Sequence, residues 1–192
     1  MLSKKDWEKR ADWGLFQAGS GWCAAAWTSL GLSALVLPQK KEAMALRKIQ
    51  EYLPPLSVDF WKGKRKKVPR NIQRLVRLAL LGKPFRFNRF DIFFLTLFQQ
   101  KILKATCEIP WGQTRSYGWV ARKAGSPRGF RAAGQALTRN PVSVLIPCHR
   151  VVAGANRLGG YGGGLDWKIR LLNNEGVTVI GGLVTSYRQE KL

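Results

Sequence analysis

The segment IPCHRVV, residues 146–152, decides how this chain is read. In it Cys148 directly precedes His149, which is the only histidine among 192 residues, and the cationic Arg150 follows. A thiol becomes a strong nucleophile only as a thiolate, and a nearby imidazole or guanidinium lowers its pKa. The segment therefore predicts a reactive cysteine. A buried strand cysteine beside a surface histidine is the alternative that these residues alone leave open.

The backbone around this pair sets a geometric condition. Successive side chains of a regular strand point to opposite faces, so a direct bond between Cys148 and His149 needs a break in the strand or an intervening water. Pro147 provides a break, because it fixes φ and lacks a backbone donor. We expect a strand over 142–146 that ends at Pro147, with Cys148 on the following turn and its sulfur facing a pocket.

The residues upstream of this segment predict two consecutive helices. Ser116 is a good N-cap for a helix through 124, which a glycine closes. Ser126 and a following proline are expected to open the next helix, which runs to about 139 after a turn of three residues. Helix, short turn and helix form the helix-turn-helix motif. Small residues over 132–134 would let this second helix approach a partner closely, and the excess of positive charge favours DNA over plain helix packing.

Further elements are expected on both sides of this motif. Towards the C-terminus, a glycine-rich loop over 159–164 leads into a last helix over 165–174. An apolar stripe predicts a helix over 91–107, followed by a turn at 110–112. These segments make the C-terminal domain, 91–192, mainly helical.

The first 90 residues predict a small α/β domain. Residues 13–37 are rich in Gly, Ala, Trp and Leu with two turn breaks, which indicates two or three short strands. Apolar residues at helical spacing predict a helix over 40–53, which Pro54 and Pro55 stop. Residues 58–60 are expected to form another strand.

The composition is unusual in its large positive net charge. The chain has 33 Lys and Arg against 11 Asp and Glu, a formal net charge of +22, which favours polyanionic partners such as nucleic acid or an anionic membrane. Residues 62–77 hold eight basic residues and no acidic one. A solvated basic helix face or loop is the alternative for that segment.

Cysteine usage and hydropathy predict an intracellular protein. Three cysteines cannot all pair, no secretory signal opens the sequence, and no stretch approaches the ~18 apolar residues of a membrane helix. With one histidine and no Cys-x-x-Cys spacing, no metal site is expected.

Several pieces between residues 98 and 176 occur in an order that resembles the O6-alkylguanine-DNA alkyltransferases. The resemblance covers about the last 80 residues well and the N-terminal half loosely. Its pieces are QQK (99–101), EIPWG (108–112), TRSY (114–117), RA (131–132), NP (140–141), IPCHRVV (146–152), GGYGGG (159–164) and LLNNEG (171–176).

This resemblance implies a DNA repair protein, cytoplasmic in a prokaryote or nuclear in a eukaryote, that transfers an alkyl group from O6-alkylguanine, and from O4-alkylthymine, irreversibly to itself. The cysteine matching Cys148 accepts the group once per molecule, without a cofactor. The histidine matching His149 relays the proton through a water, and the glutamate matching Glu175 orients it. Asn140 matches an asparagine that supports this network. The implied fold is a ribonuclease-H-like N-terminal sheet and a winged-helix-like C-terminal domain, as a monomer without membrane contact.

The resemblance also implies how double-stranded DNA carrying alkylated bases is bound. The damaged nucleotide must be flipped out of the duplex to reach the thiol. Arg131 matches an arginine that fills the gap in the stack, and its helix enters the minor groove, where little sequence is readable. The accompanying DNA contacts and pocket positions on this chain are Ala132, Gln135, Arg139, Tyr117, Val151, Tyr161 and Gly162.

Two of these positions depart from the family pattern, and the sequence leaves three other functions to consider. Gly162 stands where several members have a serine, which leaves its backbone N–H for the O6 atom, and Arg139 replaces a small residue. A lesion-binding protein without alkyl transfer would lack Cys148. A cysteine hydrolase usually has its histidine far away in sequence. A helix-turn-helix regulator without chemistry is the remaining alternative.

Overall fold

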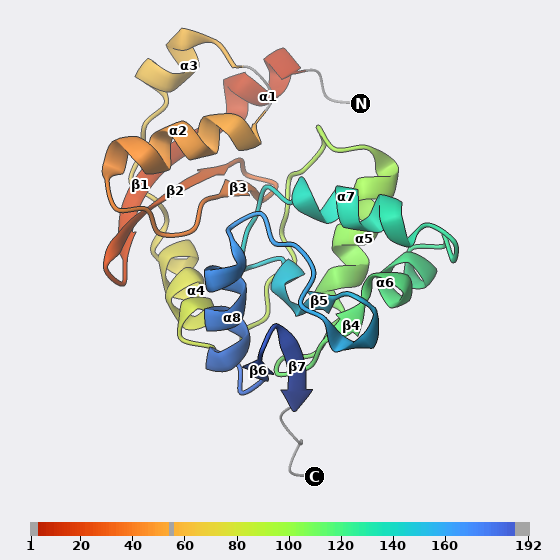
Figure 1. Cartoon of the computed structure of the whole chain (residues 1–192). Helices are drawn as coiled ribbons and strands as arrows, with labels where there is room; N and C mark the ends of the chain where they lie inside the picture. Colours follow the sequence, from red (N-terminus) through yellow and green to blue (C-terminus); the bar gives the residue numbers. More distant parts are fainter. Residues whose placement is uncertain (1–3, 54–55, 187–192) are drawn as a thin grey trace. The chain divides into compact units, whose positions relative to one another are not determined.

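A computed structural model describes residues 4–53 and 56–186. The chain divides into two compact units of mixed helix and strand content (Figure 1). The N-terminal unit comprises 1–77, 86–96 and 141–143, and the C-terminal unit comprises 78–85, 97–140 and 144–192. The expected mixture of α and β structure is confirmed, whereas the predicted domain boundary after residue 90 stays a prediction.

A three-stranded antiparallel sheet organises the N-terminal unit. Its strands are β1 (Asp12–Ala18), β2 (Gly21–Trp27) and β3 (Leu32–Leu35), in the order β1-β2-β3. The three strands predicted over 13–37 are thus confirmed. The helix predicted over 40–53 is α2 (Glu42–Tyr52), which buries Ala45 and Ile49. The prolines expected to stop it, Pro54 and Pro55, lie outside the described residues.

Two further helices show how local capping overrides a β-rich composition. α1 (Lys4–Arg10) buries Trp7 completely in the core of this unit. The strand expected at 58–60 is wrong, because these residues begin α3 (Val58–Gly63). The Ser57 hydroxyl accepts a hydrogen bond from the Phe60 backbone N–H at 3.2 Å, an N-cap that starts a helix.

The basic segment continues into α4 (Arg70–Leu80). The helix expected over 91–107 begins later, as α5 (Leu97–Cys107). Residues 91–96 cannot join it, because the Asp91 N–H donates to the Leu32 carbonyl and its carboxylate accepts a bond from the Thr28 hydroxyl at 2.6 Å.

Short elements complete the C-terminal unit. They are β4 (Arg115–Ser116), α6 (Tyr117–Lys123), α7 (Phe130–Thr138), a 3₁₀ turn (Cys148–Arg150), β5 (Val151–Val152), a second 3₁₀ turn (Gly154–Asn156), α8 (Leu165–Asn174), β6 (Thr178–Ile180) and β7 (Leu183–Ser186). β4 pairs in parallel with β5, and β6 pairs antiparallel with β7. No helix among the described residues is both long and apolar enough to cross a membrane.

The two consecutive helices are present, but the second starts later than expected. Ser116 caps α6 as predicted, since its hydroxyl accepts from the Trp119 N–H at 3.2 Å. α7 begins at Phe130 and not at Pro127, so the connection spans 124–129. The Gly129 N–H bonds to the Ser126 carbonyl at 2.8 Å, and this closes a separate turn before the helix.

The strand predicted over 142–146 is also wrong. Val142 pairs with Leu35 in an isolated bridge, and Val144 has a left-handed backbone with φ of 68°. That conformation is costly for a β-branched residue and reverses the chain. Every residue from 141 to 150 is nevertheless buried, so the apolar run forms an irregular core segment that carries Cys148.

Candidate active site

Cys148 lies on the turn after Pro147, as predicted. The turn Cys148–Arg150 is held by the Cys148 N–H, which donates to the Ile146 carbonyl at 2.8 Å, and by the Arg150 N–H, which donates to the Pro147 carbonyl at 2.9 Å. Only 8% of Cys148 is exposed. The backbone break thus holds the thiol at the edge of the core.

Asn140 fixes the thiol from the side. Its amide Nδ2 donates to Cys148 Sγ at 3.0 Å and to the Ile146 carbonyl at 3.1 Å. A donor aimed at sulfur favours the thiolate over the thiol. These contacts link Asn140 to both the turn and the thiol, and its expected support of the reactive network stays a prediction.

Burial is the largest influence on the acidity of Cys148, and it raises the pKa of the thiol. Asn140, the charge of Lys168 and nearby backbone amides act in the opposite direction without cancelling it. Neither the His149 imidazole nor the Arg150 guanidinium, which the sequence suggested, contributes to lowering this pKa. The resting cysteine is therefore a thiol, and its proton must leave as it reacts.

His149, Arg150 and Glu175 form a buried cluster. Glu175 follows α8 and is 3% exposed. Its Oε1 is 2.9 Å from His149 Nε2 and 2.9 Å from Arg150 Nη2, and its Oε2 accepts from Arg150 Nε at 2.9 Å. Arg150 is thus engaged by Glu175 and is directed away from a hydrogen bond with the cysteine.

The cluster sets the protonation of the histidine. Burial would raise the pKa of Glu175, but the hydrogen bonds and charges of His149 and Arg150 overcome this and hold it at about 2. Burial lowers the pKa of His149. A neutral imidazole beside a carboxylate carries its proton on Nε2, which leaves Nδ1 as an acceptor. Nδ1 is buried without a hydrogen-bond partner among the described residues, so it is ready to take up a proton.

Lys168 is a functional candidate that the sequence analysis missed. It is fully buried on α8, and its ammonium donates to the carbonyls of Val151 at 2.6 Å, Gly160 at 3.3 Å and, closer still, Leu158. Burial lowers its pKa to about 8, while the charge of Cys148 acts in the opposite direction. A helical wheel could have revealed it, because position 168 shares the buried face with Leu171 and Leu172.

Two tyrosines and one close-packed glycine, Gly159, belong to the surroundings of the site. The half-buried Tyr117 donates from its hydroxyl to the Gly160 carbonyl at 3.5 Å. Gly159 has φ of 66°, and a Cβ there would lie 3.0 Å from that hydroxyl. Tyr161 meets the His149 ring edge to face at 6.5 Å between centroids. Position 159 therefore needs glycine, whose backbone can lie against Tyr117.

The predicted DNA contacts lie together on one surface of α7. Arg131, Ala132, Gln135 and Arg139 are all exposed, whereas Ala133, Ala136 and Leu137 are buried. Arg131 lies over the ring of Phe130, with 5.6 Å from its guanidinium carbon to the ring centre. Phe130 is itself 50% exposed and was not among the predicted contacts. Of the expected pocket positions, Val151 is fully buried and Gly162 is exposed.

Replacing Lys168 with Met should raise the pKa of Cys148, because it removes a positive charge that favours the thiolate. Each unit of rise leaves about tenfold less thiolate near neutral pH. Since Lys168 itself titrates at about 8, the difference from the wild type should be largest below that pH and shrink above it. Iodoacetamide labelling of Cys148 across pH, followed by peptide mapping, measures this effect. Lys101→Met, a change at an exposed lysine, is the control. Equal labelling profiles across pH for the wild type, Lys168→Met and Lys101→Met would contradict the predicted effect of Lys168 on Cys148.

Comparison with known proteins places this site in a family. Residues 97–177 match the family described as "6-O-methylguanine DNA methyltransferase, DNA binding domain". A Mycobacterium leprae methylated-DNA–protein-cysteine methyltransferase is 49% identical over 80 residues, 42% of this chain and 48% of that protein. The solved structure of Mycobacterium tuberculosis OGT in complex with DNA has a TM-score of 0.67 at 28% identity and covers 86% of this chain and 93% of its own.

A relative from Methanosarcina barkeri extends the match beyond the DNA-binding region. This methylated-DNA–protein-cysteine methyltransferase is 40% identical over 132 residues, which is 62% of this chain and 82% of that protein. Since the match takes in most of that relative, the chain belongs to the methylated-DNA–protein-cysteine methyltransferase family.

Proposed function

We propose that this protein repairs DNA by transferring the alkyl group of O6-alkylguanine, and of O4-alkylthymine, to Cys148. The observation that carries the proposal is the buried thiol of Cys148, which precedes a neutral His149 held by Glu175 at 2.9 Å. Family membership supports the reaction class. The lesion carbon is sp³, and a soft, unhindered sulfur suits displacement at such a carbon.

The proton of Cys148 leaves towards His149. A water between the thiol and Nδ1 passes the proton to the imidazole, and the carboxylate of Glu175 stabilises the imidazolium that forms. The S–C bond then forms as the C–O6 bond of guanine breaks, and the electron pair of that bond goes to the base. The base takes up a proton as the imidazolium of His149 gives one up, so the products are a thioether, unmodified guanine and a neutral His149.

The reaction ends with one alkyl group on each protein molecule. A thioether is a poor leaving group, and no described residue provides a route to remove it. Intact mass after incubation with excess O6-methylguanine DNA should show a single added methyl group per chain. Catalytic conversion of many lesions by one chain, with no gain in its mass, would contradict this stoichiometry.

The surface of α7 is proposed to bind duplex DNA with a flipped nucleotide. Arg131 fills the space in the base stack, while Ala132, Gln135 and Arg139 lie along the groove. Ala132 leaves room on the exposed face for close approach to a minor groove, where little sequence is readable. Tyr117, Val151, Tyr161 and the Gly162 backbone contact the base in the pocket. The Val151 carbonyl already accepts from Lys168, and its second lone pair remains for a base amino group.

The proposal includes a winged-helix-like C-terminal unit and a ribonuclease-H-like N-terminal unit. The parallel pair β4 and β5, which packs against α6, and the hairpin β6 and β7, which packs against α8, support a winged-helix-like arrangement in the C-terminal unit. The antiparallel β1-β2-β3 sheet supports the ribonuclease-H-like N-terminal unit. A protein that only binds the lesion is less well supported, because the complete Cys148, His149 and Glu175 set is present.

Replacing Arg131 with Ala should slow reaction with an alkylated duplex and leave reaction with the free alkylated base unchanged. Unstacking costs a few kcal/mol, so loss of the inserted side chain should slow the duplex reaction by roughly tenfold to a hundredfold. Two single-turnover rates on each protein measure the effect, with the exposed Arg170→Ala as control. Equal slowing on base and duplex would show that Arg131 serves the pocket or the fold instead.

A further inference from the structure

A concentrated positive surface on the N-terminal unit takes no part in the site around Cys148. α4 presents Arg70, Arg74 and Arg77, which are spaced by four and three residues and therefore lie on one helix face. All three are exposed, and none forms an ion pair with a carboxylate among the described residues. Residues 62–77 contain no acidic residue that would neutralise them.

Two lysines just before α4 add positive charge, and a backbone hydrogen bond to β1 fixes their position. Lys66 and Lys67 are exposed, and the Lys66 N–H donates to the Trp13 carbonyl of β1 at 2.7 Å. Close contact here depends on Gly14, because a Cβ at that position would lie 2.2 Å from the Lys66 carbonyl oxygen. The sheet edge thus holds this segment in place. We call Lys66, Lys67, Arg70, Arg74 and Arg77 the α4 basic face.

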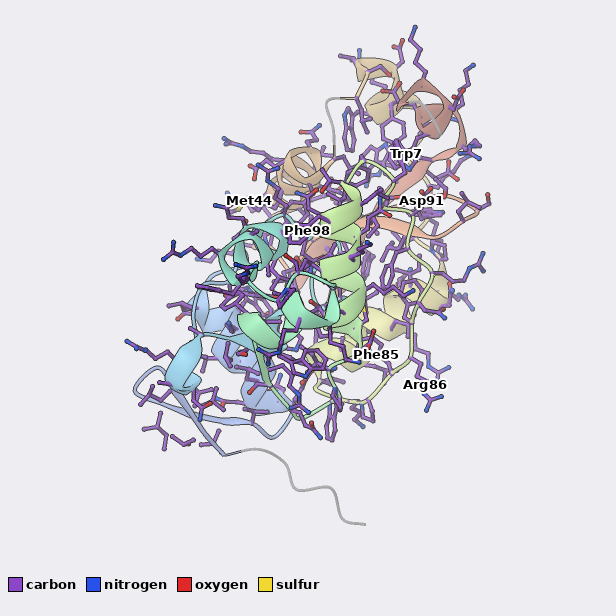
Figure 2. All side chains as sticks on the ribbon, turned by 90° about the vertical axis from the view of Figure 1, so that its right-hand side faces the viewer. Trp7, Met44, Phe85, Arg86, Asp91 and Phe98 are labelled. Atoms are coloured by element: carbon purple, nitrogen blue, oxygen red, sulfur yellow. The ribbon has the colours of Figure 1, made fainter. Side chains whose placement is uncertain are left out.

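A pocket opens beside the first turn of α4. It encloses about 140 Å³ and is lined by the half-buried aromatic rings of Trp27 and Phe87, together with Asn71 and Arg89. The Arg89 guanidinium donates to the Ser29 carbonyl at 2.8 Å, which fixes it at the rim. Arg86, one residue before Phe87, extends away from the ribbon (Figure 2). Aromatic and cationic groups therefore meet where the basic face begins.

The packing of α4 distinguishes between polyanionic partners. A basic amphipathic helix binds membranes by inserting its apolar face. Here Ile72, Val76 and Ala79 are buried at 6%, 1% and 3% exposure, so that face is already used by the fold. Only the charged face is available, which favours a partner recognised through phosphates and stacked rings over a lipid surface.

We propose that the α4 basic face and this pocket bind a single strand of nucleic acid. The backbone phosphates lie along the five cations, and one unpaired base enters the pocket to stack on Trp27 and Phe87. Cationic grooves with exposed aromatic rings bind single strands in this way, with little dependence on sequence. The surface belongs to a different unit from α7 and does not require alkyl transfer at Cys148.

The test compares two triple variants of the full-length protein with equal loss of charge. R70Q/R74Q/R77Q removes three of the five cations of the basic face and replaces each with a good helix-forming residue. K5Q/K40Q/R47Q removes three exposed charges elsewhere in the same unit. Binding to oligo-dT, oligo-rU, an undamaged duplex and anionic vesicles is measured over a range of salt concentrations. Transfer from the free alkylated base reports separately on Cys148.

The first variant should bind both single strands more weakly, with a log–log salt slope shallower by roughly 2, while the second should resemble the wild type. Phe87→Ala should weaken single-strand binding by about tenfold and leave duplex binding unchanged. A stronger loss for oligo-dT than for oligo-rU, or the reverse, identifies which strand is preferred. Equal behaviour of the two triple variants, or a loss confined to vesicles, would overturn the proposal. If alkyl transfer to Cys148 is unchanged in every variant, the outcome for single-strand binding leaves the proposed repair function unaffected.

Discussion

Replacing Cys148 with Ala is expected to abolish alkyl uptake completely, because the bond to the alkyl carbon is made by its sulfur. Neither remaining cysteine is prepared for this reaction. Burial raises the pKa of Cys23 to about 12. Cys107 ends α5, where the negative end of the helix dipole disfavours a thiolate. Peptide mapping after reaction with O6-methylguanine DNA measures which cysteine carries the group.

The control for this result is Cys107→Ala, which should keep full alkyl uptake on Cys148. Cys107 is the more demanding comparison, because the residue is exposed, whereas Cys23 is buried. Methyl transfer that survives Cys148→Ala, or a methyl group mapped to Cys107 in the wild-type protein, would contradict the assignment of Cys148 as acceptor.

The parts of the fold that were predictable from sequence have local causes. Ser116 begins α6 because its hydroxyl satisfies a backbone donor of the first turn, and that bond needs only neighbouring residues. The turn at Cys148 follows from the restricted φ of Pro147 in the same way. The failed strand over 142–146 had no local marker. Residues 142–146 are mostly apolar, as buried residues usually are. The pattern of apolar residues does not distinguish a buried strand from a buried irregular segment.

Site residues that belong to a local sequence motif were predictable. Contacts that long-range packing makes between distant residues were not. Cys148, His149 and Glu175 were found because their sequence neighbourhoods match a family pattern. The engagement of Arg150 by Glu175 joins residues 25 positions apart and gave no signal in the segment itself. Lys168 was missed because a lysine is ordinarily exposed, and its burial depends on three carbonyls that only the folded loop brings together.

Replacing Glu175 with Gln should cost roughly 3–5 kcal/mol of folding stability near neutral pH, because it leaves the buried guanidinium of Arg150 without its anionic partner. Urea unfolding measures this loss. The matched control is Glu108→Gln, which breaks the exposed pair between Glu108 and Lys123 at 3.2 Å and should cost at most about 1 kcal/mol. Similar losses for the two variants would contradict a structural charge cluster behind the acceptor.

The same variant has a pH dependence with a definite sign. The pKa of Glu175 in the folded protein is about 2, below its ordinary value of 4.5, so its contribution is complete above about 4.5 and is lost as the pH falls towards 2. The stability difference between the wild type and Glu175→Gln should therefore shrink over that interval. His149 acts at higher pH, because its lowered pKa keeps it neutral in the fold while the unfolded chain gains a proton below about 6.5. Wild-type stability should thus begin to fall below that pH, before Glu175 is protonated. A stability difference between the wild type and Glu175→Gln that instead grew on acidification would contradict an ionised Glu175 in the folded protein.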